Sequence, residues 1–186
     1  DQKKMTDIQA LSIDDILPGA RINGAQVKNA TTSSFLISGA GGSIGAEITR
    51  QLLLNNPKQI ILLEMSEFNL FNIERECAVI RSSKKFTTEI IPILGDIRDS
   101  DNLDFIFSKY RIDNVYHAAA YKHVPLVEDQ NNIAKAAENN ILGTFNLAQV
   151  AIKHNIKSFV MISTDKAVRP TNVMGATKRF AEIIIQ

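Results

Sequence analysis

The chain has 186 residues, 45% of them hydrophobic and 22% charged, and its 21 basic residues are balanced by 20 acidic ones. This composition is typical of a globular domain. The formal net charge of +1 excludes the basic excess of a nucleic-acid-binding surface. No stretch reaches the roughly 18 consecutive apolar residues of a membrane span. Cys77 is the single cysteine, which excludes an internal disulfide and favours a reducing compartment such as the cytoplasm. The three histidines lack partners at metal-ligand spacing, so we expect no metal site.

Residues 1–34 carry scattered apolar positions and turn signals such as Pro18-Gly19, and a capping-box-like pattern at Ser12 predicts a short helix. We interpret this segment as an arm or linker. The sequence begins without methionine and stops inside an apolar helical run at residues 183–186, with no stop signal. We therefore expect a piece of a longer protein, truncated on the C-terminal side of its domain.

From residue 35 onward, short apolar runs alternate with helical patterns. The runs predict strands at 35–38, 59–64, 89–94, 114–119 and 158–163, and the spacing predicts helices at 45–55, 67–82, 103–110, 131–154 and from about 175. Pro92 favours an edge or a bulge for the third strand. Strands that alternate with helices predict a doubly wound parallel sheet, a Rossmann-like α/β fold covering residues 35–186.

A glycine-rich loop joins the first predicted strand to the first predicted helix. Gly39, Gly42 and Gly45 have the spacing G-x-x-G-x-x-G, with Gly41, Ser43 and Ile44 among the residues between them. Such a loop lets the backbone approach a dinucleotide pyrophosphate, whose charge the helix N-terminus stabilises. An ordinary glycine-rich turn is the alternative, and the strand–loop–helix context disfavours it.

Further candidates for cofactor binding follow the next three strands. Glu64 lies 19 residues after Gly45, where a carboxylate accepts hydrogen bonds from the adenosine ribose and favours NAD over NADP. NADP remains the alternative cofactor, and a solvated acid is the alternative role. Asp96 and Ile97 lie where an adenine edge is expected, although Asp96 is equally suited to bonding its own turn. Ala118–Ala120 indicate either a close cofactor approach or tight packing.

Five segments in one order carry a specific resemblance: Ser38–Gly45, Gly95–Asp99, His117–Glu128, Asn139–Thr144 and Ser163–Arg179. Together they resemble the extended short-chain dehydrogenase/reductase superfamily, and within it the UDP-N-acetylglucosamine 4,6-dehydratase branch of capsule, O-antigen and glycosylation polysaccharide-biosynthesis proteins. The resemblance covers residues 35–186, and residues 163–179 are its most specific part. Residues 1–34 loosely resemble the connector of longer members, many of which carry N-terminal membrane helices.

The resemblance implies roles for two sets of residues. The superfamily usually has Tyr-x-x-x-Lys where this chain has Met174 and Lys178; methionine has no proton to exchange, and its presence resembles the larger dehydratases of the branch. Lys178 is implied to hold the nicotinamide ribose. After the fifth strand, Asp165 is implied as the acid, Lys166 as the base at the sugar C5, and Thr164 as a hydrogen-bond partner at O4. Without the resemblance, Asp165 and Lys166 are a solvated ion pair.

Secondary candidates are Lys122, His123, Asn140 and Arg169. Lys122 and His123 flank the expected cofactor and sugar region, and Asn140 resembles a position that supports either the active-site backbone or the substrate. His117 is interpreted as a hydrogen-bonded core histidine. The sequence thus predicts the NAD-binding portion of a UDP-N-acetylhexosamine 4,6-dehydratase, with the substrate-binding part beyond residue 186. We expect a homo-oligomer, in the cytoplasm or on the cytoplasmic face of a membrane. The alternatives are a nucleotide-sugar 4-epimerase, which normally keeps the tyrosine and lacks the Asp-Lys pair, and a non-catalytic dinucleotide-binding module.

Overall fold

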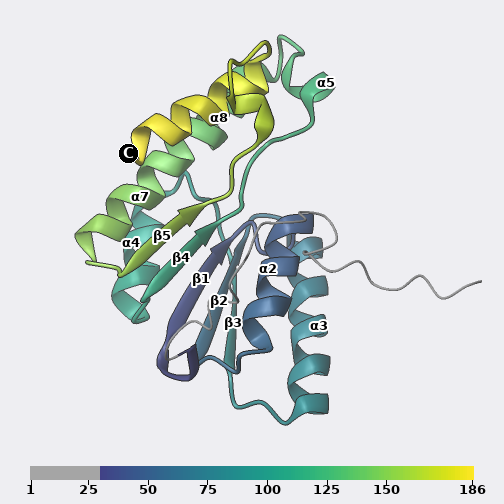
Figure 1. Ribbon diagram of the computed structural model, residues 1–186, viewed down its shortest axis with the longest axis vertical. Coiled ribbons are helices and arrows are strands. Elements are labelled where there is room, and N and C mark those ends of the chain that lie inside the picture. The colour runs from purple at the N-terminus through teal and green to yellow at the C-terminus, as the bar shows by residue number, and fades with distance from the viewer. Residues whose placement is uncertain (1–29) are drawn as a thin grey trace, which may run out of the picture.

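The computed structural model describes residues 30–186, which form a five-stranded parallel sheet flanked by helices (Figure 1). The strands stand in the order β3-β2-β1-β4-β5. Their bounds are β1 (Ser34–Ser38), β2 (Gln59–Glu64), β3 (Glu89–Leu94), β4 (Asn114–His117) and β5 (Ser158–Met161). The predicted doubly wound fold is confirmed, and so is the edge position of β3 with its Pro92. The helix predicted at Ser12 lies outside the described residues.

Every helix predicted after residue 35 is present. The α-helices are α2 (Ser43–Leu53), α3 (Glu67–Lys84), α4 (Ser100–Lys109), α5 (Val124–Val127), α6 (Ile133–Ala137), α7 (Gly143–Lys153) and α8 (Val173–Ile184). Two short 3-10 turns are η1 (Ala30–Thr32) and η3 (Asp165–Ala167), and a π-helical turn, η2 (Glu138–Leu142), joins α6 to α7. The single long helix predicted at 131–154 therefore contains a π-helical interruption.

Two hydrophobic cores lie on opposite faces of the sheet. Phe35 and Ile37 pack with residues of α2 and α3 in one core, whereas Leu36 packs with residues of α4 and α7 in the other. Alternate residues of a strand point to opposite faces, so a strand covered on both faces needs apolar residues at every position. This explains why β1 and β2 are continuous apolar runs, buried along their whole length.

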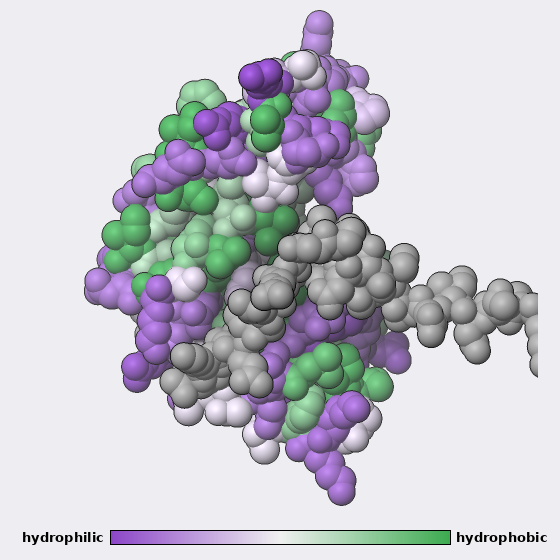
Figure 2. Space-filling model, viewed as in Figure 1, coloured by the Kyte–Doolittle hydropathy of each residue, from purple (hydrophilic) through white to green (hydrophobic). Residues whose placement is uncertain are grey.

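The fifth strand is less covered than the first two. β5 lies at the edge of the sheet and alternates between exposed and half-buried residues. Val160 of β5 and Phe180 and Ile183 of α8 are exposed, and Figure 2 shows apolar surface over these two elements. Within residues 30–186 no helix has the length and apolarity needed to cross a membrane.

Two strands end earlier than predicted, and the loops that replace their last residues matter for the site. β4 ends at His117 and β5 at Met161, so the apolar residues Ala118, Ala119 and Ile162 lie in loops. Because all five strands are parallel, these loops meet those after β1, β2 and β3 at one edge of the sheet. Open α/β sheets bind ligands at this edge.

Candidate functional site

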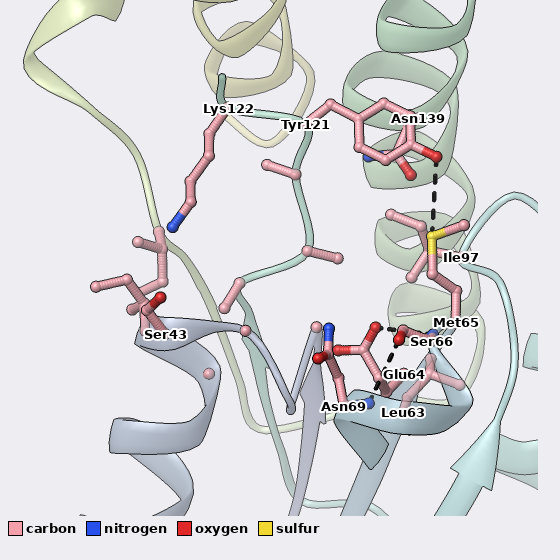
Figure 3. Close-up of a pocket in the computed structure, with 18 of the residues that line it drawn as sticks. Ser43, Leu63, Glu64, Met65, Ser66, Asn69, Ile97, Tyr121, Lys122 and Asn139 are labelled. Atoms are coloured by element: carbon pink, nitrogen blue, oxygen red, sulfur yellow. Dashed lines mark hydrogen bonds between the residues drawn. The ribbon is translucent and has the colours of Figure 1, made fainter. Parts of the chain in front are cut away.

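A cavity of about 620 Å³ lies at the carboxyl ends of the strands, and its size is ordinary for a ligand site. It brings together most of the residues singled out from the sequence (Figure 3). These are Gly39, Gly42, Ser43, Ile44, Gly45, Glu64, Asp96, Ile97, Ala118, Ala119, Ala120, Lys122, Thr164, Lys166, Met174 and Lys178. Five other candidates, Gly41, His123, Asn140, Asp165 and Arg169, do not line it.

The glycine loop is held against both neighbouring strands. The Gly39 N–H donates to the carbonyl oxygen of Leu63 at the end of β2, at 2.8 Å. Gly39 has a φ of +67°, and a β-carbon on it would lie 2.7 Å from the backbone of Ala119. A β-carbon on Gly45 would overlap the carbonyl oxygen of Gly39. Only glycine fits at these two positions, and the loop can therefore pack directly against the backbone at the ends of the neighbouring strands.

The first turn of α2 faces the cavity. Gly42 is its N-cap residue and supplies no side-chain hydrogen bond, while Ser43, Ile44 and Gly45 line the cavity wall. The N-terminus of a helix carries about half a positive charge, together with N–H groups that lack partners within the helix. An anionic group such as a pyrophosphate suits this position.

Glu64 ends β2 beside the glycine loop and is only 6% exposed. One carboxylate oxygen accepts the Gly41 N–H and the other accepts the Ser66 N–H, each at 3.0 Å. Gly41 thus orients Glu64 instead of lining the cavity. The two backbone bonds fix an anionic acceptor in the cavity wall, in the place where the sequence predicted a ribose partner.

Asp96 and Ile97 follow β3 and also line the cavity. The Asp96 carboxylate accepts the backbone N–H of Arg98 at 2.9 Å and forms an ion pair with the Arg98 guanidinium. Hydrogen bonds from that guanidinium hold the pKa of Asp96 below its usual range. Asp96 therefore bonds its own turn, as one sequence interpretation held, and still borders the cavity, as the other required.

Asn140 supports the loop after β4. It is 1% exposed, its side-chain oxygen accepts the Tyr121 N–H at 2.8 Å, and its amide nitrogen donates to the Tyr121 carbonyl at 2.9 Å. The Tyr121 hydroxyl donates to Met65 Sδ across the cavity at 3.9 Å (Figure 3). Asn140 thus positions a cavity-lining residue, whereas His123 is the exposed N-cap residue of α5.

The segment after β5 bonds mainly to itself. The Thr164 hydroxyl donates to Asp165 Oδ1 at 2.9 Å, and Lys166 Nζ lies 3.4 Å from the same oxygen. The Asp165 side chain is 87% exposed, and the Thr164 hydroxyl and Lys166 lower its pKa. Thr164 and Lys166 line the cavity, so residues that carry a hydroxyl and an amine border it, while the ionised carboxylate of Asp165 lies beside it.

Met174 and Lys178 lie one turn apart on α8, and both line the cavity. Met174 is buried against Val127 and Ala136. The Lys178 amine donates to the carbonyl oxygen of Ile162 at 2.7 Å, and burial lowers its pKa. The site therefore contains a buried amine but no proton-exchanging group at position 174.

Several cavity residues were not singled out from the sequence. They are Leu63, Met65, Ser66, Asn69, Gly95, Tyr121, Asn139, Ile162 and Ser163. Most of them directly end or follow a predicted strand, so the position alone was a usable signal. Asn69 lies in a helical segment, where no local pattern distinguishes it from a surface residue. Asn139 begins the segment Asn139–Thr144 that carries the resemblance, but the resemblance implied no role for it.

Curated relatives carry names that span two related activities. The chain is 45% identical over 156 residues to the capsular polysaccharide biosynthesis protein CapD of Staphylococcus aureus, covering 84% of the chain and 25% of the relative. It is 34% identical over 147 residues to a UDP-N-acetylglucosamine 4,6-dehydratase (inverting) of Campylobacter jejuni, covering 78% and 40%. It is also 32% identical over 169 residues to a UDP-glucose 4-epimerase of Pisum sativum, covering 83% and 47%. The chain thus spans between a quarter and a half of these relatives.

Among solved structures, the fold matches a UDP-glucose 4-epimerase from Bifidobacterium longum in complex with NAD+ and UDP. The TM-score is 0.67 at 24% identity, over 82% of this chain and 48% of that one. Residues 35–186, the stretch that contains the whole sheet apart from its first residue, match the family described as polysaccharide biosynthesis protein. The glycine loop, the cavity and these matches agree, and the chain belongs to the polysaccharide biosynthesis protein family.

Proposed function

We propose that the chain is the NAD-binding portion of a nucleotide-sugar 4,6-dehydratase that acts on a UDP-N-acetylhexosamine in surface-polysaccharide or glycan biosynthesis. The observation that carries this proposal is the composition of one cavity. A glycine loop and a buried carboxylate, Glu64, occupy one end, and Thr164, Lys166 and Lys178 occupy the other. A hydride-transfer site with an adjacent proton-transfer group needs this combination.

The residues present fit a dinucleotide. The α2 N-terminus and the glycine loop would hold the pyrophosphate, and Glu64 would accept from the ribose hydroxyls, where its charge would repel a 2′-phosphate. Asp96 and Ile97 would border the adenine. The B. longum neighbour contains NAD+, which supports the same assignment here, and Glu64 makes NAD the expected cofactor.

The proposed reaction divides its proton transfers among residues after β5. Held by the glycine loop and Lys178, NAD would supply a hydride acceptor for C4 of the sugar and a hydride donor for C6. Oxidation at C4 releases the O4 proton, which passes through the Thr164 hydroxyl to the Asp165 carboxylate that this hydroxyl contacts. The ketone at C4 acidifies the C5 proton, which the Lys166 amine removes. Asp165 gives its proton to the C6 hydroxyl, which leaves as water, and Lys166 returns a proton to C5. Thr164 bonds O4, and Lys178 holds the nicotinamide ribose. Because Asp165 is ionised and exposed in this structure, its acid role requires the bound sugar to cover it and raise its pKa.

The second candidate is a 4-epimerase, which transfers hydride at C4 without breaking the C5–H bond. The Pisum sativum relative carries that name. Two features favour the dehydratase. Lys166 lines the cavity and its amine pairs with Asp165, and Met174 occupies the position where a proton-exchanging tyrosine is usual.

Cofactor binding is tested by calorimetry with NAD on the chain and on Gly42→Asp. Gly42 has φ −71° and ψ 163°, which any residue adopts, and a β-carbon there would meet only the Gly39 oxygen, at a tight 3.3 Å, so a side chain requires a small shift of the loop. We expect Gly42→Asp to abolish NAD binding by charge repulsion, and Gly42→Asn, of equal size, to retain more of it. Equal affinity in all three proteins would overturn the assignment. NADP binding at least tenfold tighter than NAD, about 1.4 kcal/mol, would overturn the role of Glu64.

The chemistry is tested in the whole protein with UDP-N-acetylglucosamine and NAD in deuterated water. We expect a 4-keto-6-deoxy product with deuterium at C5, and we expect Lys166→Ala to bind NAD normally while losing C5 exchange. A 4-epimer without deuterium would establish the epimerase. NAD binding without any turnover would leave a non-catalytic module, and wild-type exchange in Lys166→Ala would remove Lys166 from the base role.

A further inference from the structure

A chain of buried side-chain hydrogen bonds runs beneath the cavity. Ser38 Oγ lies 2.6 Å from His117 Nδ1, and His117 Nε2 lies 2.8 Å from Thr144 Oγ1. The Thr144 hydroxyl donates to the backbone carbonyl oxygen of Asn140 at 2.7 Å. All four residues are at most 1% exposed, so no bond in the chain has solvent as an alternative partner. The structure confirms His117 as a hydrogen-bonded core histidine, and it also shows where that histidine connects.

The direction of each hydrogen bond follows from the number of protons available. A threonine hydroxyl has one proton, and Thr144 gives it to the Asn140 carbonyl, so Thr144 Oγ1 must accept from His117. His117 therefore carries its proton on Nε2, and its bare Nδ1 accepts from the Ser38 hydroxyl. Burial lowers the pKa of His117 to about 3, which keeps the ring neutral and prevents a second proton from reversing the Ser38 bond.

Each end of this chain is next to a wall of the cavity. Ser38 directly precedes Gly39. Its register partner in the neighbouring strand β4 is His117, which directly precedes Ala118. Asn140 holds both backbone groups of Tyr121 and donates to Thr177, the neighbour of Lys178. The hydrogen-bonded chain thus links the glycine loop, the loop after β4 and α8.

The glycine loop and the loop after β4 are packed backbone against backbone, because a β-carbon on Gly39 would already lie 2.7 Å from Ala119. We infer that His117, as the Nε2-protonated tautomer, is a positioning residue of the cofactor site that fixes the glycine loop against the loop after β4 without touching the ligand. The inference rests on the proposed function only in naming NAD as that ligand. It assigns His117 an effect on the affinity for NAD, exerted through Ser38 and Tyr121, in addition to its packing in the core.

The tautomer is tested directly by NMR on the wild-type chain with 15N-labelled histidine. Long-range N–H correlations distinguish a protonated ring nitrogen from a bare one, and substitution of His123 and His154 assigns the signals. We expect His117 to be protonated at Nε2 and bare at Nδ1 from pH 5 to pH 8. Protonation at Nδ1, or a mixture of tautomers, would overturn the inference without reference to any ligand.

The positioning role is tested by two substitutions at one residue. Thr144→Val removes the hydroxyl at nearly constant volume, and we expect it to raise the Kd for NAD at least tenfold and to disturb the His117 tautomer. Thr144→Ser keeps the hydroxyl and should restore both. The matched control is Thr88→Val: Thr88 is equally buried and bonded to Asn56 but precedes β3, at the opposite end of the sheet, so its Kd for NAD should stay unchanged.

The outcomes separate this inference from the proposed function. If the wild-type chain binds no NAD, the proposed function fails while the tautomer is still measured. If the wild type binds NAD and Thr144→Val binds it equally well, the positioning role is wrong although the cofactor assignment stands. Should Thr144→Val fail to fold, Ser38→Ala breaks the other end of the chain, and an unchanged Kd in that variant would overturn the inference.

Discussion

The two ends of the cavity are built in different ways. At the glycine-loop end (residues 38–45 and 64–66), strands β1 and β2 are buried throughout, and backbone N–H groups fix both the loop and Glu64. At the β5 end (residues 162–166), the strand is half exposed, and Thr164, Asp165 and Lys166 bond one another. One end is shaped by the core, and the other by a short turn.

Because the two ends are built differently, substitutions that change the stability of the fold are expected at the glycine-loop end, and substitutions that change only the reaction are expected at the β5 end. A change at the glycine-loop end must disturb core packing and the cavity together, because the same atoms serve both. A change at the β5 end alters groups whose partners are adjacent in sequence, so the sheet is unaffected. Binding and catalysis are therefore expected to respond to different substitutions, and three measurements test this.

The largest effect is expected for Gly45→Val. Its β-carbon would overlap the Gly39 carbonyl oxygen, so the loop must move, and overpacking of this kind typically costs about 1–3 kcal/mol. We expect a lower free energy of unfolding in urea and at least a hundredfold weaker NAD binding. Gly42→Ala is the control, since its β-carbon would meet a single atom, the Gly39 carbonyl oxygen at 3.3 Å, a tight contact that a shift of a few tenths of an ångström relieves. Equal losses in both variants would contradict the packing argument.

An intermediate effect is expected for Lys178, the buried amine that reaches the β5 end. Burial lowers its pKa in the folded state, so between that pKa and its ordinary value of about 10.4 the unfolded chain binds more protons. The free energy of unfolding should rise with pH in this window through Lys178. Comparison of urea denaturation for wild type and Lys178→Met at several alkaline pH values isolates this contribution, and identical slopes would rule it out.

The smallest effect is expected for Asp165→Asn. The carboxylate is exposed and bonds only within its own turn, and surface changes of this kind rarely alter stability. We expect an unchanged midpoint of thermal unfolding by circular dichroism and unchanged NAD binding. A clear drop in the midpoint would show that the β5 end is tied to the core after all, and the contrast between the two ends would fail.

The contrast also explains which features the sequence predicted. Gly39 and Gly45 are required by the local path of the backbone, so their spacing alone indicated the loop, and the apolar runs of β1 and β2 indicated burial on both faces. The resemblance implied that Asn140 supports either the active-site backbone or the substrate, and the structure shows the first of these. Its partner, Tyr121, lies 19 residues earlier, and local patterns do not reveal such pairing. Ala118 and Ala119 lie in a loop although the sequence predicts a strand there, because small apolar residues suit either a strand or a close-packed loop.

The π-helical turn at Glu138–Leu142 gives the segment from α6 to α7 a fixed side-chain phase. A π-turn closes its hydrogen bonds one residue further along the chain than an α-turn, so the extra residue is absorbed within the turn. Asn140 can therefore hold Tyr121 while Leu147 stays in the core that α7 shares with α4. A further inserted residue would rotate α7 by about 100° relative to α6, and either Asn140 would leave Tyr121 or Leu147 would leave the core. Single-residue insertions should be rejected here and accepted in the turns at the far end of the sheet.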